Sequence, residues 1–298
     1  MTASVGKASE DQHGVQAAQD FARAHPGLVK LGRLGWVAKG VVYALTGFLA
    51  LFIAFSPEST TAPTTDGTAG KEASQSGAIA KLADTTGGTL LLYVVAVGLV
   101  LYSVWRIVSV LLPASSAASS WVTRVGYLIS AAAYLVLAWV AVSIVRNPGD
   151  PQKSEDSKVE SFTRDLLGQS YGRILVFLVG AALVGVAAVF LVKAITANFT
   201  SELAHRGVGP VPFGTIVAMG RVGWVGRTAM MGLIGFFLCR SAVRFDANEA
   251  QGLDGSLRQA VTSDVGTVLA VVVAIGLLVY GLFCVLSAPR QLLVAADR

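Results

Sequence analysis

The sequence is poor in charged residues and in the side chains that most often carry catalysis. Only 14% of its 298 residues are charged, whereas 54% are apolar; a soluble domain usually carries about a quarter charged residues. It has two cysteines and three histidines, with no CxxC pair and no His/Cys/carboxylate cluster typical of a metal site. The composition indicates one very large buried core or a membrane protein, and we expect no cofactor and no metal.

Long apolar runs decide between these two classes. No charged residue interrupts Val125–Val145, Ile174–Val192 or Val265–Ala288, and a bilayer core of roughly 30 Å takes about 20 helical residues to cross. Backbone groups in lipid must pair within their own segment, so these runs form helices. The sequence predicts an all-α integral membrane protein with six transmembrane helices, at residues 36–55, 89–111, 124–145, 173–193, 221–244 and 266–288.

These predicted spans also lack the features of several functional classes. They contain no Asp or Glu, although proton relays and cation pathways normally place carboxylates there. No proline interrupts them, whereas many transporters have broken helices. No nucleophile–base pair and no phosphate-binding glycine loop is visible. We therefore expect a protein that is not an enzyme, and we disfavour a proton-driven antiporter or a cation channel.

A four-residue pattern, Arg-x-Gly-aromatic, occurs three times. It begins at Arg33, Arg124 and Arg221, and each copy opens a predicted helix that leaves the cytoplasm. The second helix of each pair begins at a glycine and later carries a small residue, followed four residues on by Tyr102, Val186 or Tyr280. The repeating unit is therefore a two-helix hairpin, and the second copy diverges most.

Because each unit has an even number of helices, all three share one orientation. Parallel repeats are related by an axis along the membrane normal, so we predict three hairpins with pseudo-threefold symmetry. The expected organisation is a polar cytoplasmic arm, three hairpin repeats and a cytoplasmic tail, at residues 1–30, 31–115, 120–200, 217–290 and 291–298. Short amphipathic stretches at 77–84, 159–167 and 255–260 are expected to cap the outer loops.

The distribution of basic residues predicts the topology. Lys and Arg outnumber Asp and Glu in the N-terminal arm, around Pro113, in residues 193–227 and in the tail, whereas acidic residues are in excess in the other loops. Short flanks rich in Lys and Arg stay in the cytoplasm. We expect a multi-pass plasma membrane protein with both termini cytoplasmic.

The basic residues of the repeats are the candidate binding residues. Six residues after the pattern arginines come Lys39, Ser130 and Arg227. The arginines suit an inner-leaflet anchor, with the glycine as a packing notch between helices. Alternatively, a cytoplasmic-side basic cluster binds an anion or a lipid headgroup; its residues would be Arg33, Lys39, Arg124, Arg221 and Arg227.

Three further residues or groups have a predicted role. Arg240 is an intramembrane charge found in one repeat only, and it is a functional candidate unless it snorkels outward toward Asp246. Tyr102, Trp105 and Arg106 are expected to anchor an inner helix end rather than to form a cation–π site. Cys239 and Cys284 are expected near opposite leaflets and therefore unpaired.

The motifs resemble a bacterial family of membrane proteins. Besides the Arg-x-Gly-aromatic pattern, a second helix that runs Gly-x-x-Leu-Leu…Tyr-x-x-Trp-Arg over Gly87–Arg106 is similar to a domain of unknown function with three two-helix repeats, common in actinobacteria and cyanobacteria. Lys193-Ala194…Phe199 also fits, whereas Glu160-Ser161-Phe162 departs. The resemblance covers residues 28–290 and implies a plasma membrane location and the repeat architecture. It brings no activity, ligand or catalytic residue.

Two functions remain open from the sequence. The first is a non-enzymatic membrane scaffold, or a lipid- or partner-binding protein, with membrane lipids, a protein partner or a second copy as partners and no nucleic acid. The small-residue faces Gly40/Ala44 and Gly126/Ser130 favour it. The alternative is a channel or carrier for a small neutral or anionic solute along the repeat axis, lined by Thr46, Ser103, Ser130 and Thr228, although such side chains also bond their own helix backbone.

Overall fold

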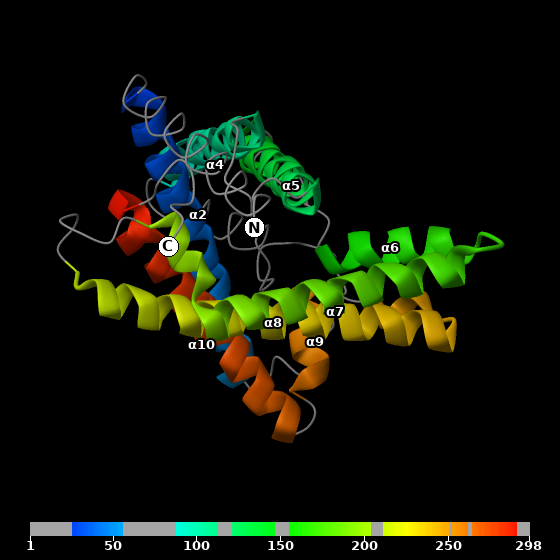
Figure 1. Ribbon diagram of the computed structural model, residues 1–298. Helices are drawn as coiled ribbons and strands as arrows, with labels where there is room; N and C mark the ends of the chain where they lie inside the picture. The colour runs from blue at the N-terminus through cyan, green and yellow to red at the C-terminus, as the bar shows by residue number, and fades with distance from the viewer. Residues whose placement is uncertain are drawn as a thin grey trace, which may run out of the picture.

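The computed structural model describes residues 26–55, 88–111, 121–146, 155–203, 211–250, 252–261 and 264–290. Within these residues the chain forms α-helices and short 3-10 helices (Figure 1). Six of the helices are long and apolar enough to cross a membrane, which confirms the predicted helical class. They are α2 (Pro26–Phe55), α4 (Gly88–Leu111), α5 (Trp121–Arg146), α7 (Gly172–Thr196), α8 (Phe213–Arg244) and α10 (Asp264–Ser287).

Two of these helices begin well before the predicted spans. α2 starts at Pro26 rather than at residue 36, and α8 starts at Phe213 rather than at 221. Proline has no N–H to leave unpaired and a φ suited to a first helical turn, and Pro26 opens α2 while Pro212 directly precedes α8. α2 therefore extends into the predicted polar arm, at residues 26–30. Residues 1–25 lie outside the described residues.

Shorter helices flank the long ones. Two of the predicted amphipathic stretches are helical, as α6 (Glu155–Leu167) and α9 (Leu253–Ala260), and the stretch at 77–84 lies outside the described residues. The described residues also include the 3-10 helices η3 (Asn198–Glu202), η4 (Ala247–Glu249) and η5 (Ala288–Arg290).

The long helices pack as a series. The pairs in close contact are α5 with α4, α4 with α2, α2 with α10, α10 with α8, and α8 with α7. In Figure 1, α7 and α8 run side by side across the α2–α10 pair. The two helices of the first hairpin, α2 and α4, pack together, as do α8 and α10 of the third. In the described residues α5 and α7, the helices of the second hairpin, share no such interface. The pseudo-threefold symmetry stays a prediction.

The glycine of the repeated pattern is a packing notch in two repeats. A Cβ on Gly35 would lie 2.7 Å from the Tyr102 Cα, and one on Gly223 would lie 2.7 Å from the Tyr280 Cα. These are distances at which backbone must shift, so only glycine allows α2 to approach α4 and α8 to approach α10 so closely. Gly126 of the second repeat has nothing within 4 Å of the same point.

The two predicted small-residue faces, Gly40/Ala44 and Gly126/Ser130, pack differently in the structure. Gly40 and Ala44 pack against α10, because a Cβ on Gly281 would lie 2.7 Å from the Ala44 Cβ. That face therefore packs as a small-residue helix contact, and it joins the first and third repeats. At one end of the other face, a Cβ on Gly126 would meet nothing within 4 Å in the described residues. Cys239 and Cys284 are both unpaired, which confirms that expectation.

Candidate functional site: a buried basic and aromatic cluster

The side chain of Lys39 is buried in the helical core, although it ends in an ammonium group. It is 3% exposed on α2, and its ammonium lies over five aromatic rings. The distances from Nζ to the ring centroids are 4.5 Å for Trp36, 4.9 Å for Tyr102, 5.4 Å for Tyr280, 5.5 Å for Tyr134 and 5.9 Å for Tyr43. The negative ring faces attract the ammonium by about 0.5–2 kcal/mol each.

The hydroxyl of Tyr102 joins two cations. Lys39 Nζ donates to it at 3.1 Å and Arg106 Nε donates to it at 2.9 Å. The Arg106 guanidinium also lies over the rings of Tyr102 and Tyr127, at 5.3 and 4.6 Å from their centroids. Tyr102 is 1% exposed, so the expectation that Tyr102 and Arg106 only anchor a helix end was wrong. Tyr102 faces into the core because the Gly35 notch brings α2 onto it.

Arg227 on α8 repeats this arrangement in the third hairpin. Its Nη1 donates to the Tyr280 hydroxyl at 2.9 Å. Its Cζ lies 4.5 Å from the Phe190 ring centroid, 4.9 Å from those of Trp224 and Tyr280, and 5.4 Å from that of Tyr43. Lys39 and Arg227 therefore share the rings of Tyr43 and Tyr280. We call Lys39, Arg106 and Arg227, with the aromatic rings around them, the basic–aromatic cluster.

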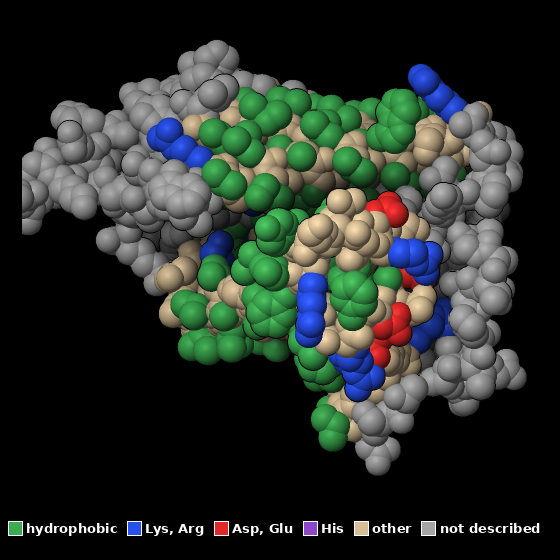
Figure 2. Space-filling model, turned by 90° about the vertical axis from the view of Figure 1, so that its right-hand side faces the viewer, with side chains coloured by type: hydrophobic (Ala, Val, Ile, Leu, Met, Phe, Trp, Pro, Cys, Tyr) green, Lys and Arg blue, Asp and Glu red, His purple; other side chains and the backbone are tan. Residues whose placement is uncertain are grey.

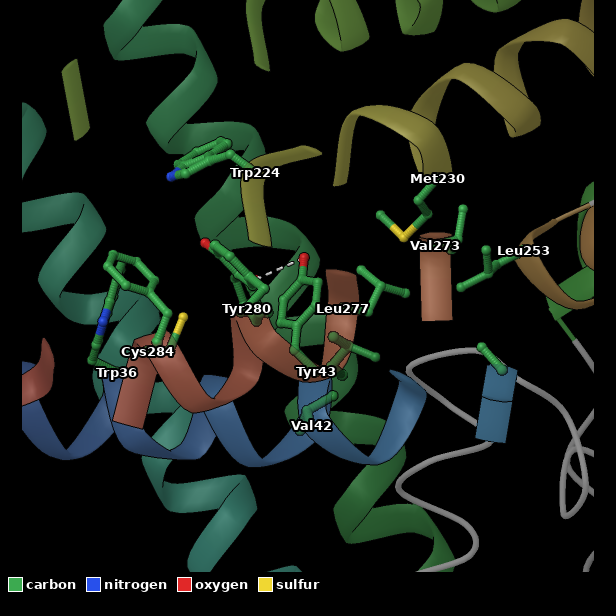
Figure 3. Packing of buried hydrophobic residues seen from close by; sticks show 14 of the residues in the cluster. Trp36, Val42, Tyr43, Trp224, Met230, Leu253, Val273, Leu277, Tyr280 and Cys284 are labelled. Carbon is green, nitrogen blue, oxygen red and sulfur yellow. Dashed lines mark hydrogen bonds between the residues drawn. The ribbon is translucent and has the colours of Figure 1, made fainter. Parts of the chain in front are cut away.

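The tyrosines of the basic–aromatic cluster form a frame that spans four helices. Tyr43 of α2 packs edge-on against Tyr280 of α10 with centroids 5.0 Å apart, and Tyr102 of α4 packs edge-on against Tyr134 of α5 at 4.7 Å. Tyr134 donates a long hydrogen bond of 3.5 Å to the Tyr43 hydroxyl. Figure 3 shows Tyr43 and Tyr280 together in the core, with Trp224 on the α8 side and Trp36 beside Cys284.

Lys39 and Arg227 form no ion pair with an acidic side chain among the described residues. The six apolar helical segments that could cross a membrane contain no Asp or Glu. In a low dielectric an ion costs several kcal/mol to bury without an opposite charge. Two buried donors at the basic–aromatic cluster also have no acceptor in the described residues: Arg227 Nε and Trp224 Nε1, the latter on a side chain that is 9% exposed. Buried N–H groups are normally paired. The arrangement is suited to accepting an anion.

Lys39 and Arg227 are the predicted site residues that the structure brings together. The three pattern arginines lie elsewhere: Arg124 and Arg221 are exposed, and Arg33 is half-buried. None of these three takes part in the ring contacts around Lys39 and Arg227 that are described above. Whether the pattern arginines bind headgroups at a membrane surface stays a prediction.

Arg240 belongs to a separate ion-pair network at the far end of α8. Its Nε pairs with Glu249 of η4, and Arg244 Nη1 pairs with the same carboxylate at 2.7 Å. The sequence suggested Asp246 as the nearby acid, but Asp246 instead accepts hydrogen bonds from Asn248 at 2.9 Å. The pairing of Arg240 with the Glu249 carboxylate is that of a structural ion pair, and Arg240 has no part in the basic–aromatic cluster.

The sequence contained a pattern that could have identified the tyrosines that accept hydrogen bonds from these cations. Lys39 and Arg227 occupy the same repeat position, and so do their acceptors Tyr102 and Tyr280. The second repeat has Ser130 and Val186 at these two positions, so the cation and its acceptor are absent from it together. That joint replacement links the two positions, and it could have predicted both hydrogen bonds.

The fold and the site define a class: a protein of six apolar helices, built from repeated helix pairs, with a basic–aromatic cluster in its core. The chain belongs to the family described as Domain of Unknown Function, DUF1206, whose model matches residues 34–112, 125–197 and 222–290. These segments agree with the three predicted repeats. The chain is also 29% identical over 269 residues to the uncharacterized protein YxxB of Bacillus subtilis (strain 168), covering 89% of this chain and 92% of that protein. No solved structure matches.

Proposed function

We propose that this is an integral membrane protein that binds an anionic group, of the phosphate type, in the basic–aromatic cluster and catalyses no reaction. One observation carries the proposal. Lys39, Arg106 and Arg227 gather around buried tyrosine hydroxyls while the six apolar segments contain no carboxylate. An anion would neutralise this charge and accept from Arg227 Nε and Trp224 Nε1, which lack acceptors in the described residues.

The predicted topology supports a role on the cytoplasmic side of the plasma membrane. Lys39 follows the start of the apolar segment Gly32–Leu51 by seven residues, which is about 10 Å of helix. With both termini cytoplasmic, the cluster lies within reach of the inner leaflet, where anionic lipids concentrate. A lipid- or partner-binding scaffold is the role that this placement favours, and nucleic acid is not among the expected partners.

The repeat positions support a shared centre for the site. Lys39 and Arg227 are equivalent between repeats, as are Tyr43 and Tyr134, and the latter two hydroxyls lie 3.5 Å apart. Equivalent residues meet near an axis when repeats are related by rotation. This supports the pseudo-threefold arrangement, with the binding site close to its axis.

A carrier or channel for a small solute is the second candidate, and the polar side chains argue against it. Thr46, Ser103 and Thr228 each donate to the backbone carbonyl four residues earlier in their own helix, at 2.9, 2.9 and 3.0 Å. Such bonds satisfy the hydroxyl within the helix. These residues therefore offer a passing solute fewer free polar groups than the sequence suggested.

Equilibrium binding tests the proposed function. The purified protein in neutral detergent is titrated separately with phosphatidylglycerol and with inorganic phosphate, as wild type and as Arg227→Gln. We expect Arg227→Gln to weaken binding of whichever anion binds by at least about tenfold, since a charge-assisted hydrogen bond is lost. Arg146→Gln is the control, because Arg146 is exposed at the end of α5. If Arg227→Gln and Arg146→Gln bind both anions like the wild type, the proposal is wrong.

A further inference from the structure

Among the described residues, the series of packed helices is open at the second repeat. In chain order, each long helix contacts the next, and α10 contacts α2, except that α5 and α7 share no interface in the described residues. If α5 and α7 were also in contact, the six long helices would form a closed ring. In Figure 1, α5 lies apart from α7, and Figure 2 shows a recess below the apolar surface at the top of that view.

The positions that close the other two hairpins are exposed in the second repeat. Tyr102 and Tyr280 are 1% and 0% exposed, whereas Val186 at the same repeat position is 39% exposed. Gly98 and Gly276 are buried, whereas their counterpart Ala182 is exposed. On the facing helix, Gly126 has open space around it where Gly35 and Gly223 meet backbone. The opening therefore lies along the positions that would otherwise join α5 to α7.

The opening leads to the basic–aromatic cluster. α5 contributes Tyr134, whose ring lies 5.5 Å from Lys39 Nζ, and α7 contributes Phe190, whose ring lies 4.5 Å from the Arg227 guanidinium. Lys193 of α7 lies 5.2 Å from the Trp224 ring, the residue whose indole N–H has no acceptor in the described residues. A ligand between α5 and α7 thus meets apolar helix surface first and cations at its inner end.

We infer that the opening between α5 and α7 admits an acyl lipid with an anionic headgroup from the side. The headgroup binds in the basic–aromatic cluster, and an acyl chain occupies the gap between α5 and α7. This rests on the proposed function and names the class of its ligand. A free phosphate would leave the apolar gap empty, whereas a neutral lipid would bring no negative charge to Lys39 and Arg227. A lipid that combines an acyl chain with an anionic group satisfies both.

Filling the opening without disturbing the packing tests this inference. Gly126→Leu and Ala182→Leu place bulk in the gap, at positions that are exposed in the structure. Gly214→Leu is the matched control, because Gly214 also has nothing within 4 Å but lies in the first turn of α8. Binding is measured in phosphatidylcholine vesicles that carry a fluorescent phosphatidylglycerol, and separately with inorganic phosphate. Thermal unfolding shows whether each variant is folded.

We expect Gly126→Leu and Ala182→Leu to bind phosphatidylglycerol about tenfold more weakly, the effect of excluding roughly two methylene groups from the gap. Any binding of phosphate, and the behaviour of Gly214→Leu, should match the wild type. Phosphatidylglycerol bound equally by all four proteins would overturn the lateral opening while leaving anion binding intact. A dimer that Gly126→Leu disrupts, with lipid binding unchanged, would also overturn it and assign the gap to a second copy. Failure of the proposed function would give a different result: Arg227→Gln would bind phosphatidylglycerol and phosphate as the wild type does.

Discussion

Lys39 and Arg227, which are far apart in the sequence, lie over the same two tyrosine rings, Tyr43 and Tyr280. They come from equivalent positions of the first and third repeats, and each donates to a tyrosine of its own hairpin. Equivalent positions of the first and third repeats therefore place two cations close together in the core. Such placement of charge is costly unless a ligand or the aromatic faces compensate for it.

The tyrosine hydroxyls should stabilise the fold in proportion to the cations that they accept from. Tyr102→Phe removes the acceptor for both Lys39 and Arg106, whereas Tyr280→Phe removes the acceptor for Arg227. A hydrogen bond to a charged group contributes about 1.5–3 kcal/mol, so both variants should unfold more easily and Tyr102→Phe the more so. Thermal unfolding in detergent measures this. Tyr93→Phe, at an exposed ring, is the control; an equal effect there would contradict the role of the hydroxyls.

Alanine at the pattern glycine should have opposite effects in different repeats. Gly35→Ala and Gly223→Ala place a methyl group against the backbone of Tyr102 and Tyr280, and overpacking of this kind costs about 1–3 kcal/mol. Gly126→Ala meets nothing within 4 Å and should be neutral or stabilising by up to about 1 kcal/mol through helix propensity. Comparing the midpoints of chemical or thermal unfolding for the three variants checks the difference. Destabilisation by Gly126→Ala would show that α5 and α7 pack together.

The Lys39→Met variant distinguishes the free-energy cost of burying the ammonium from the contribution of the ammonium to lipid binding. In neutral detergent the variant should unfold close to the wild type, because the lost cation–π contacts and hydrogen bond are offset by an ammonium that no longer has to be desolvated. Phosphatidylglycerol at 100 times its Kd should stabilise the wild type by about 2.7 kcal/mol and leave Lys39→Met unchanged. The measurement is the shift of Tm with added lipid. Equal shifts in both proteins would place the lipid elsewhere.

The ion pairs of Glu249 should contribute modestly and should weaken with salt. Its carboxylate is 15% exposed and pairs with Arg240 and Arg244, whose side chains are 30% and 58% exposed. Exposed pairs contribute about 0.2–1 kcal/mol each, so Glu249→Gln should destabilise the protein by that order and less at high ionic strength. A double-mutant cycle with Arg240→Gln measures the coupling. A coupling energy near zero at low salt would show that Arg240 is held by other contacts.

Much of the fold can be predicted from the sequence, because a membrane helix corresponds to a single long apolar segment. The continuous run Val265–Ala288, for example, is enough to predict α10, and the glycine of the repeated pattern is enough to predict close helix contacts at Gly35 and Gly223. The early starts of α2 and α8 were missed because hydropathy marks where a helix is apolar, whereas Pro26 and Pro212 mark where it begins.

The arrangement of the second repeat could not be predicted from the pattern alone. Gly126 is the same residue as its counterparts, but the second helix of its repeat carries Val186, which lacks the ring and hydroxyl of Tyr102 and Tyr280. The site was predicted in part: Lys39 and Arg227 were named as candidates, whereas Arg106 was taken for an anchor. A cation near a helix end has the same sequence signature whether it faces a headgroup or a buried tyrosine, and only the helix packing decides between the two.

The most direct test of the account is native mass spectrometry of the protein extracted with its own membrane lipids, compared between the wild type and the Lys39→Gln/Arg227→Gln double variant. Arg146→Gln serves as the control for loss of an exposed charge. The account predicts that the wild type and Arg146→Gln carry an anionic lipid in stoichiometric amount and that the double variant loses it. A bare wild-type protein, or the same lipid on all three, would contradict the claim that the basic–aromatic cluster is a binding site.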